Sequence, residues 1–245
     1  MKEKAHNAEG IICIAAEEAY NVLRSNIQFY GFVKKIKSLV ITSCMQGEGK
    51  TTTAFNLALS MSRIGLKVLL VDADLRKPLV TKYLSNDHSP GLSNLISEQV
   101  DFSNAVYCTN VEGLNFMPAG DKPPNPVELI NSEKFDEFIL NAEDRFDMVI
   151  FDTPPLGSVI DSAVIASKTD GTLLVIKPGT VDYKMGVRVK DQLEKANARI
   201  LGVVLNKVKK RDYRNYCNYN YYNMECKPGF WSYRWISFIK KLWKK

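Results

Sequence analysis

The sequence lacks a long apolar run. No stretch approaches the roughly 20 consecutive apolar residues that a membrane-spanning helix needs, and the first ten residues, MKEKAHNAEG, lack the apolar core of a secretory signal. Among the 245 residues, 45% are hydrophobic and 24% are charged, which is ordinary for a globular core. We therefore expect a soluble, unsecreted protein.

Paired cysteines are missing as well. The chain has five cysteines, and they form neither CxxC pairs nor groups with histidine at metal-binding spacing. This pattern argues against a structural zinc site and is typical of reduced thiols in the cytosol. The five are Cys13, Cys44, Cys108, Cys217 and Cys226.

The main body of the chain has no excess of positive charge, although the whole chain carries +6. Residues 207–245 hold 11 of the 33 Lys and Arg but only two of the 27 Asp and Glu, which gives this segment +9 and leaves −3 for residues 1–206. All three tryptophans and a cluster of five tyrosines also lie there. We expect a segment so different in charge and aromatic content to have its own function.

Short apolar, β-branched runs alternate with amphipathic segments along residues 1–206, which is the pattern of βαβ units around a mostly parallel sheet. Several runs are apolar throughout, as strands covered on both faces are. The segment 51–65 has helical spacing and stops at Gly65, and 15–32 is also helical, with a stripe at Ala19, Val22, Leu23, Asn26 and Ile27. The candidate strands are 38–43, 67–74, 114–120, 147–155, 171–179 and 199–208.

The run QGEGKTTT (46–53) follows a strand and opens a helix, which is the context of a phosphate-binding P-loop. Backbone N–H groups and the helix N-terminus would hold phosphate, Lys50 would reach the β- and γ-phosphates, and the Thr51 hydroxyl would bind Mg²⁺. The loop is a variant, because Cys44 stands where the usual first glycine would be. The nucleotide-binding residues predicted here are Gly47, Glu48, Gly49, Lys50, Thr51, Thr52 and Asp152.

Two acidic motifs end candidate strands. VLLVDADLRKP places Asp72 and Asp74 at the carboxyl end of the second strand, beside the P-loop, and MVIFDTPP ends its apolar run at Asp152. Mg²⁺ prefers hard oxygen ligands and takes one or two carboxylates with a hydroxyl, phosphate oxygens and water. Three carboxylates exceed that need, so one is free to orient or deprotonate a nucleophile.

With these motifs the chain resembles the bacterial tyrosine kinases of the capsular and exopolysaccharide biosynthesis family, in the form where the kinase is a separate cytoplasmic chain. The matching elements are SCMQGEGKTT as Walker A, VLLVDADLRKP as Walker A′ and MVIFDTPP as Walker B. Further matches are GLSNLI, MPAGDKPPNPVELINS and the tyrosine cluster. The resemblance implies a P-loop NTPase fold, a doubly wound α/β sheet with helices on both faces. It also implies an ATP- and Mg²⁺-dependent autokinase that regulates polysaccharide synthesis and export.

The resemblance also implies roles by motif position. Lys50 would bind phosphate, Thr51, Asp74 and Asp152 would hold Mg²⁺, and Asp72 would act on the incoming tyrosine hydroxyl, although the division between Asp72 and Asp74 stays open. Arg76 would either stabilise charge or form an outward salt bridge. The phosphoacceptors would be Tyr213, Tyr216, Tyr219, Tyr221 and Tyr222.

The partners are implied in the same way. They are a membrane adaptor of the polysaccharide co-polymerase type, which would recruit the chain to the inner face of the membrane, a cognate tyrosine phosphatase, and copies of the chain in a ring that phosphorylation disassembles. The family's self-association pattern E-x-x-R-x-x-R is incomplete: Glu18 and Arg24 match, but Asn21 replaces the middle arginine. We expect a weakened ring, or simply an exposed amphipathic helix.

These features predict a kinase domain over 1–206, with an oligomerisation segment at 1–37, a flexible tyrosine-rich tail at 207–229 and a basic amphipathic helix at 230–245. The last segment places Trp231, Trp235 and Phe238 on one stripe near four terminal lysines. It would bind anionic lipid, or dock on the kinase body or the adaptor.

Phosphorylation would change the charge of the tail. Each phosphate adds about −1.5 to −2 charges, so four or five phosphates would offset the +9 of residues 207–245.

Three other functions fit parts of the sequence. A basic, aromatic tail is compatible with single-stranded nucleic acid, but the body has no basic excess to support it. A switch ATPase that positions division sites or partitions plasmids shares the fold, yet it carries a signature lysine where this chain has Met45. An inactive ATP-binding scaffold does not account for the intact Lys50, Asp72, Asp74 and Asp152.

Overall fold

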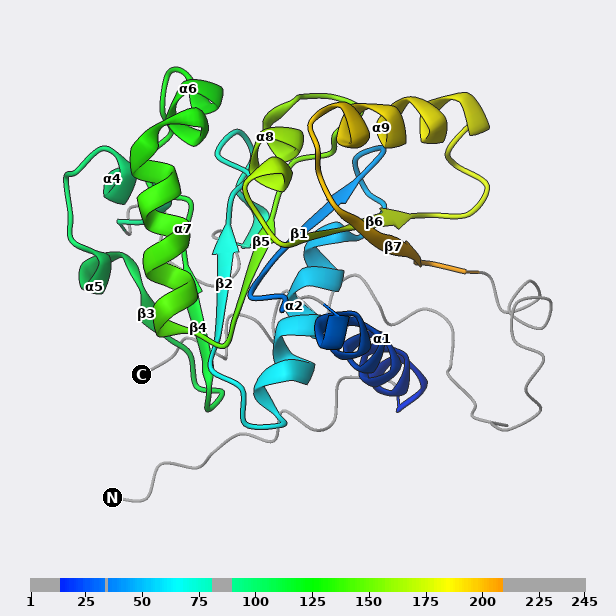
Figure 1. Cartoon of the computed structure of the whole chain (residues 1–245), viewed down its shortest axis with the longest axis horizontal. Coiled ribbons are helices and arrows are strands. Elements are labelled where there is room, and N and C mark those ends of the chain that lie inside the picture. The colour runs from blue at the N-terminus through cyan, green and yellow to red at the C-terminus, as the bar shows by residue number, and fades with distance from the viewer. Residues whose placement is uncertain (1–13, 34, 81–89, 209–245) are drawn as a thin grey trace.

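The apolar runs form one seven-stranded sheet in the computed structural model, which describes residues 14–33, 35–80 and 90–208. The strand order is β3-β4-β2-β5-β1-β6-β7, and all pairs are parallel except β3 with β4 (Figure 1). The strands are β1 Ser38–Ser43, β2 Val68–Asp72, β3 Tyr107–Cys108, β4 Leu114–Met117, β5 Met148–Asp152, β6 Gly171–Ile176 and β7 Ile200–Leu205.

All six predicted strands are confirmed, and most end several residues earlier than the predicted ranges. The excess residues follow the strands and form loops at the carboxyl edge of the sheet. The sequence analysis missed β3, because an antiparallel edge strand of two residues has no detectable period.

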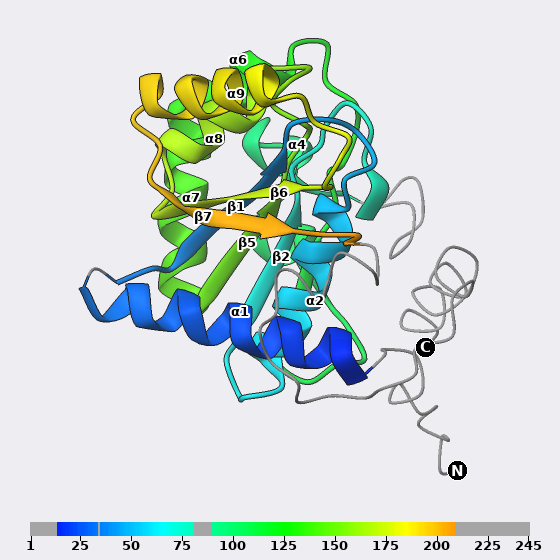
Figure 2. The same cartoon turned by 90° about the vertical axis from the view of Figure 1, so that its right-hand side faces the viewer.

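Helices cover both faces of the sheet (Figure 2). The helices α1 Ile14–Val33 and α2 Lys50–Ser62 lie on one face, while α7 Glu133–Arg145, α8 Asp161–Ser167 and α9 Tyr183–Lys195 lie on the other. Two apolar cores result, one on each side of the sheet. The remaining helices are short: α4 Leu92–Ile96, α5 Phe102–Ala105 and α6 Pro126–Asn131. Among the described residues, no helix has the length and apolar content to cross a membrane.

The helix α2 follows the predicted pattern closely. Ala54, Leu57, Ala58 and Met61 are fully buried against the sheet. Gly65 adopts a left-handed conformation with φ +89° just after the helix, as its sequence position predicted. The P-loop helix is therefore fixed to the sheet along its whole apolar face.

The buried face of α1 differs in part from the predicted stripe. Ile27 is buried and Leu23 packs against the core, as expected, but Val22 is 52% exposed, and Ala19 and Asn26 are exposed as well. The helix is rotated because polar side chains also face α2, which an apolar pattern cannot reveal.

One of these polar side chains is Arg24, whose Nη1 donates to the carbonyl and the hydroxyl of Ser60, both at 2.8 Å, and to Asn21 Oδ1 at 3.0 Å. Glu18 is exposed. Arg24, predicted as a self-association residue, is thus bound to α2 of its own chain. Its role between copies stays a prediction.

The order of the central strands corrects one expectation. β2 does not lie directly beside the P-loop strand β1, because β5 is inserted between them. The insertion places the two acidic motifs on adjacent strands, with Asp72 and Asp152 as register partners. Parallel strands end at the same edge, so both motifs meet the P-loop there.

Candidate active site

The loop between β1 and α2 has the backbone of a phosphate cradle. Gly47 and Gly49 adopt left-handed conformations with φ +85° and +98°, which side-chain-bearing residues rarely adopt. The helix begins at Lys50, so the unpaired N–H groups of its first turn, including those of Thr51 and Thr52, lie at this edge of the sheet. This end of the helix also carries partial positive charge, which favours bound anions.

The side chain of Glu48 holds this loop in shape from inside. Glu48 is 2% exposed, and its Oε2 accepts from the backbone N–H of Met45 at 2.6 Å. Its Oε1 accepts from the N–H of Lys177, which follows β6, at 3.0 Å. Both carboxylate oxygens therefore bind backbone donors, and this side chain contributes to the predicted nucleotide site by shaping the loop.

The end of β7 packs against the outside of the same loop. Asn206 Nδ2 donates to the carbonyl of Glu48 at 2.9 Å, and Lys207 Nζ donates to the carbonyl of Gly47 at 2.7 Å. A Cβ atom at Gly49 would lie 2.0 Å from Asn206 Nδ2, so only glycine fits there. The sequence did not indicate this contact, because Asn206 and Lys207 both fall inside the predicted strand 199–208.

The predicted acidic residues converge on the loop. Thr51 Oγ1 donates to Asp152 Oδ2 at 2.7 Å. Lys50 Nζ lies 3.9 Å from Asp74 Oδ2, and Asp74 is 5% exposed. Asp72 is fully buried, and its Oδ1 accepts from the N–H of Asp74 at 3.3 Å. Walker A, Walker A′ and Walker B thus form one buried cluster.

Burial dominates the electrostatics of these carboxylates. It raises the pKa of Asp152 to about 6, against the opposing effects of Lys50 and of the Thr51 hydrogen bond, and the negative charge of Asp74 adds to the rise. Burial likewise raises the pKa of Asp74 above its usual value, although the N–H of Lys77 and the charge of Lys50 lower it. One ammonium group therefore does not balance the buried acidic groups around it.

The donor set fits a hydrated magnesium ion bound together with phosphate. Asp152 Oδ1 is buried and has no hydrogen-bond partner, beside the hydroxyl of Thr51. Within the described residues, no group of three or more His, Cys, Asp or Glu side chains is placed to hold a metal alone. Mg²⁺ usually keeps several waters and takes phosphate oxygens as ligands, so a hydroxyl and one or two carboxylates are enough from the protein.

Arg76 makes a salt bridge, but its partner is a buried residue that the sequence analysis did not identify. Its Nε donates to Asp161 Oδ2 at 2.7 Å and its Nη2 to Asp161 Oδ1 at 3.1 Å. The side chain of Asp161 is 1% exposed and that of Arg76 is 39% exposed. Asp161 starts α8, in the stretch that follows Walker B, and no motif or period distinguished it.

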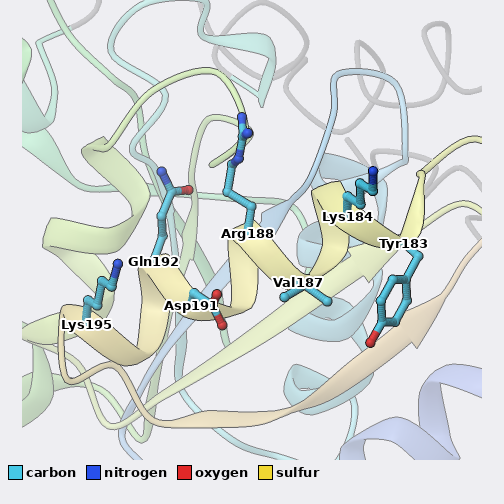
Figure 3. Close-up of a pocket in the computed structure, with 7 residues that line it drawn as sticks. All are labelled: Tyr183, Lys184, Val187, Arg188, Asp191, Gln192 and Lys195. Atoms are coloured by element: carbon cyan, nitrogen blue, oxygen red, sulfur yellow. The ribbon is translucent and has the colours of Figure 1, made fainter.

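A separate hollow of about 540 Å³ lies on the outer face of α9 (Figure 3). None of its lining residues belongs to the P-loop or to the acidic motifs. Tyr183, at the first position of α9, is 82% exposed. The lining residues are Tyr183, Lys184, Val187, Arg188, Asp191, Gln192 and Lys195.

The five predicted phosphoacceptor tyrosines and the segment 230–245 lie outside the described residues.

A glycine loop between a central parallel strand and a buried helix, facing acidic strand ends, defines a P-loop nucleoside triphosphatase fold. The "AAA domain" family model matches residues 36–187. The tyrosine-protein kinase CpsD of Streptococcus agalactiae is 40% identical over 206 residues, covering 83% of this chain and 89% of that protein. The tyrosine-protein kinase YwqD of Bacillus subtilis is 37% identical over 202 residues, covering 82% and 85%. The chain belongs to this family of bacterial tyrosine kinases.

Solved structures agree with this assignment. The chimerical protein CapA2B2 superposes with a TM-score of 0.77 at 32% identity, covering 83% of this chain and 88% of that one. The cell division ATPase MinD of Pyrococcus furiosus reaches 0.59 at 29% identity and covers 69% and 71%. The alternative of a switch ATPase is therefore the weaker one.

Proposed function

We propose that this protein-tyrosine kinase transfers the γ-phosphoryl group of ATP to tyrosines of its own C-terminal segment and thereby regulates capsular or extracellular polysaccharide synthesis and export. The observation that carries the proposal is the junction of three motifs in one buried cluster. There Thr51 hydrogen-bonds to Asp152, and Lys50 lies 3.9 Å from Asp74. This arrangement suits phosphoryl transfer, which depends mainly on positioning and charge stabilisation.

Each residue of the cluster has a role in this proposal. Lys50 and the first-turn N–H groups of α2 bind the phosphates, and Thr51, Asp74 and Asp152 hold Mg²⁺. When bound, the ion neutralises charge on the phosphate oxygens. Asp72 orients the tyrosine hydroxyl and accepts its proton late, because free tyrosine, with a pKa near 10, does not give its proton fully to a free aspartate, with a pKa near 4, before reaction.

The division of roles between Asp72 and Asp74 is tested by two matched variants. Asp72→Asn should lower kcat while the affinity for Mg·ATP stays close to that of the wild type. Asp74→Asn should weaken nucleotide binding in Mg²⁺ but not in EDTA. The opposite pattern would exchange the two assignments. Both variants keep the side-chain volume, so differences in packing do not confound the comparison.

The position of the last described residues supports the role of the C-terminal segment as the substrate. Asn206 and Lys207 contact the P-loop, so the residues that precede this segment lie beside the phosphate site. We assign the kinase domain to residues 1–206, the acceptor tail to 207–229 and a membrane- or partner-binding segment to 230–245. The acceptors are the five tyrosines between Tyr213 and Tyr222.

The decisive measurement is the intact mass of the purified chain before and after incubation with Mg·ATP. Increments of about 80 Da per phosphate should appear in the wild type. They should vanish in Lys50→Met, and in the variant with the five tail tyrosines changed to Phe. Tyr183→Phe is the matched control, because this tyrosine is 82% exposed yet held at the start of a helix, where Gly186 N bonds to Asp182 O. A label that persists in the five-tyrosine variant would contradict the acceptor assignment.

We propose that transfer occurs mainly between copies of the chain. The five-tyrosine variant, which keeps an intact site, should label Lys50→Met, which keeps an intact tail. No label in this mixture, with normal labelling of the wild type, would restrict transfer to one chain.

A membrane adaptor of the polysaccharide co-polymerase type would assemble the copies at the inner face of the membrane. A peptide from the cytoplasmic end of such an adaptor should therefore raise the labelling rate.

A further inference from the structure

We infer that Asp161 is a positioning residue for phosphoryl transfer, which acts through Arg76 to hold the Walker A′ loop, residues 73–77, in place. The inference rests on the proposed function, because it concerns the same site. Neither residue needs to contact the nucleotide for this role. It arises from an ion pair that joins the Walker A′ loop to the segment that follows Walker B.

The ion pair has the geometry of a rigid connection. Arg76 donates through two nitrogens to the two oxygens of Asp161, at 2.7 and 3.1 Å. Such a two-point contact fixes the orientation of the guanidinium group as well as its distance. Asp161 is buried, so this interaction is weakly screened by solvent, and the contact also raises the pKa of Arg76.

Asp161 is itself anchored to the sheet. The hydroxyl of the next residue, Ser162, donates to the carbonyl of Pro154, which lies in the Walker B motif just after β5. The hydroxyl of Thr42, in β1, donates to the same carbonyl at 2.9 Å. The N-terminus of α8 is therefore fixed relative to both the P-loop strand and Asp152. Through Arg76, this fixed point restrains a loop on the other side of β5.

The restrained loop carries the carboxylate that faces Lys50. Asp74 Oδ1 accepts from the N–H of Lys77 at 2.9 Å, one residue beyond Arg76. Asp74 Oδ2 lies 3.9 Å from Lys50 Nζ, at the outer limit of an ion pair. A small shift of the loop therefore changes the position of Asp74 relative to Lys50 and Asp152. Positioning errors of about 1 Å can reduce catalysis by roughly 100-fold.

A different role for Arg76 predicts different results. Arg76 could instead leave Asp161 during the reaction and stabilise charge on the transferred phosphoryl group. Asp161 would then only hold Arg76 away from the phosphate before the reaction. Removing the Asp161 charge would then release Arg76 and maintain or raise kcat, whereas removing Arg76 would lower it. In the positioning role, loss of either partner has the same effect, because each acts only through the other.

The test is a double-mutant cycle of Asp161→Asn and Arg76→Ala in the full chain, read out as autophosphorylation. Both single variants should lose roughly 10- to 100-fold in kcat. The double variant should lose no more than the worse single one. The control is Asp136→Asn, which removes one partner of the ion pair between Asp136 and Lys168 at the other end of α8 and should leave kcat unchanged.

A second readout does not depend on tyrosine transfer. Affinity for a fluorescent ADP analogue should be unchanged in EDTA, but the gain on adding Mg²⁺ should shrink about fivefold or more in Asp161→Asn. If the wild type forms no phosphotyrosine, the proposed function is wrong. The binding measurement still shows whether the ion pair between Asp161 and Arg76 supports Mg²⁺-dependent nucleotide binding. If Asp161→Asn does not fold, Arg76→Lys keeps the charge without the two-point contact and should show the same losses in smaller degree.

Three results would overturn the inference. One is a kcat and an Mg²⁺-dependent gain for Asp161→Asn within twofold of the wild type. Another is a loss in Arg76→Ala that is not matched by Asp161→Asn. The third is an equal loss in the Asp136→Asn control, which would show that any weakening of α8 has the same consequence.

Discussion

Asp152 makes the stability of the nucleotide-free protein depend on pH in a predictable direction. Burial raises the pKa of this carboxyl from 3.8 to about 6 in the folded chain. The folded state then holds a proton that the unfolded state has already released between these two values. Stability is therefore highest below pH 4 as far as this group is concerned, and it falls as pH rises through 6. Asp152→Asn removes this contribution.

The magnitude follows from the size of the shift. The pKa of Asp152 rises by roughly two units, which corresponds to about 3 kcal/mol at 1.36 kcal/mol per unit. This is the difference in the group's contribution to stability between a pH well below 4 and a pH well above 6. Between pH 5 and pH 8, linkage gives about 1.4 kcal/mol. Titrating groups that do not interact with Asp152 contribute equally to both proteins, so they cancel when the variant is compared with the wild type at each pH; Lys50 and Asp74, which interact with it, do not cancel in full.

The assay is urea unfolding in EDTA without nucleotide, at pH 5 and pH 8. Relative to the wild type, Asp152→Asn should gain about 1.4 kcal/mol in the free energy of unfolding on going from pH 5 to pH 8. Asp136→Asn serves as a control, because the side chain of Asp136 is 51% exposed, and its difference should be nearly constant. A constant or falling difference for Asp152→Asn would refute the reasoning that burial dominates this site.

Other changes have similarly direct outcomes. Gly49→Ala requires a left-handed φ of +98° and a Cβ 2.0 Å from Asn206 Nδ2, so it should cost at least about 1 kcal/mol in stability and abolish ATP binding, measured by urea unfolding and calorimetry. Burial raises the pKa of Cys44 to about 11, so iodoacetamide at pH 8 should alkylate it at least about tenfold more slowly than the exposed Cys108, measured by peptide mass mapping. Deleting residues 230–245 should reduce co-sedimentation with anionic liposomes; unchanged binding would assign that segment to protein contacts.

The strands and the P-loop were predictable because their signals are local. A run such as 38–43 is buried at every residue, and the loop that follows it carries Gly47 and Gly49. The left-handed conformations of Gly47 and Gly49 are the reason that glycine is required there. Local chemistry and the final structure agree in this region, so one sequence was sufficient.

The contacts that shape the site depend on strand order, which is not a local property. Only the insertion of β5 between β1 and β2 makes Asp72 and Asp152 register partners. Asp161 meets Arg76 across 85 positions of sequence, and Asn206 meets Glu48 across 158. No period or motif in a single sequence indicates these pairs.

The face of α1 was mispredicted in part for a related reason. The apolar pattern places Val22 inward, but the packed face also contains Arg24, which is bound by Ser60 of α2. Polar side chains that find partners on another element are as well accommodated as apolar ones. A prediction from hydrophobic periodicity assigns such polar residues to the exposed face. The predicted buried face of the helix is therefore rotated away from the true one.

The electrostatics of the site follow from its position at the end of buried strands. Apolar residues cover β2 and β5 on both faces, so Asp72 and Asp152 end strands that water does not reach. Asp74 is nearly as buried, while Arg76, a cation of the Walker A′ loop, is held by Asp161. Without nucleotide, the folded chain therefore contains buried carboxylates whose charged form is disfavoured by burial. Their ionisation near neutral pH lowers the free energy of unfolding. In the proposed function, the same imbalance would favour a cation that arrives with phosphate, since such a ligand supplies both the missing positive charge and the groups that Lys50 and the N-terminus of α2 would bind.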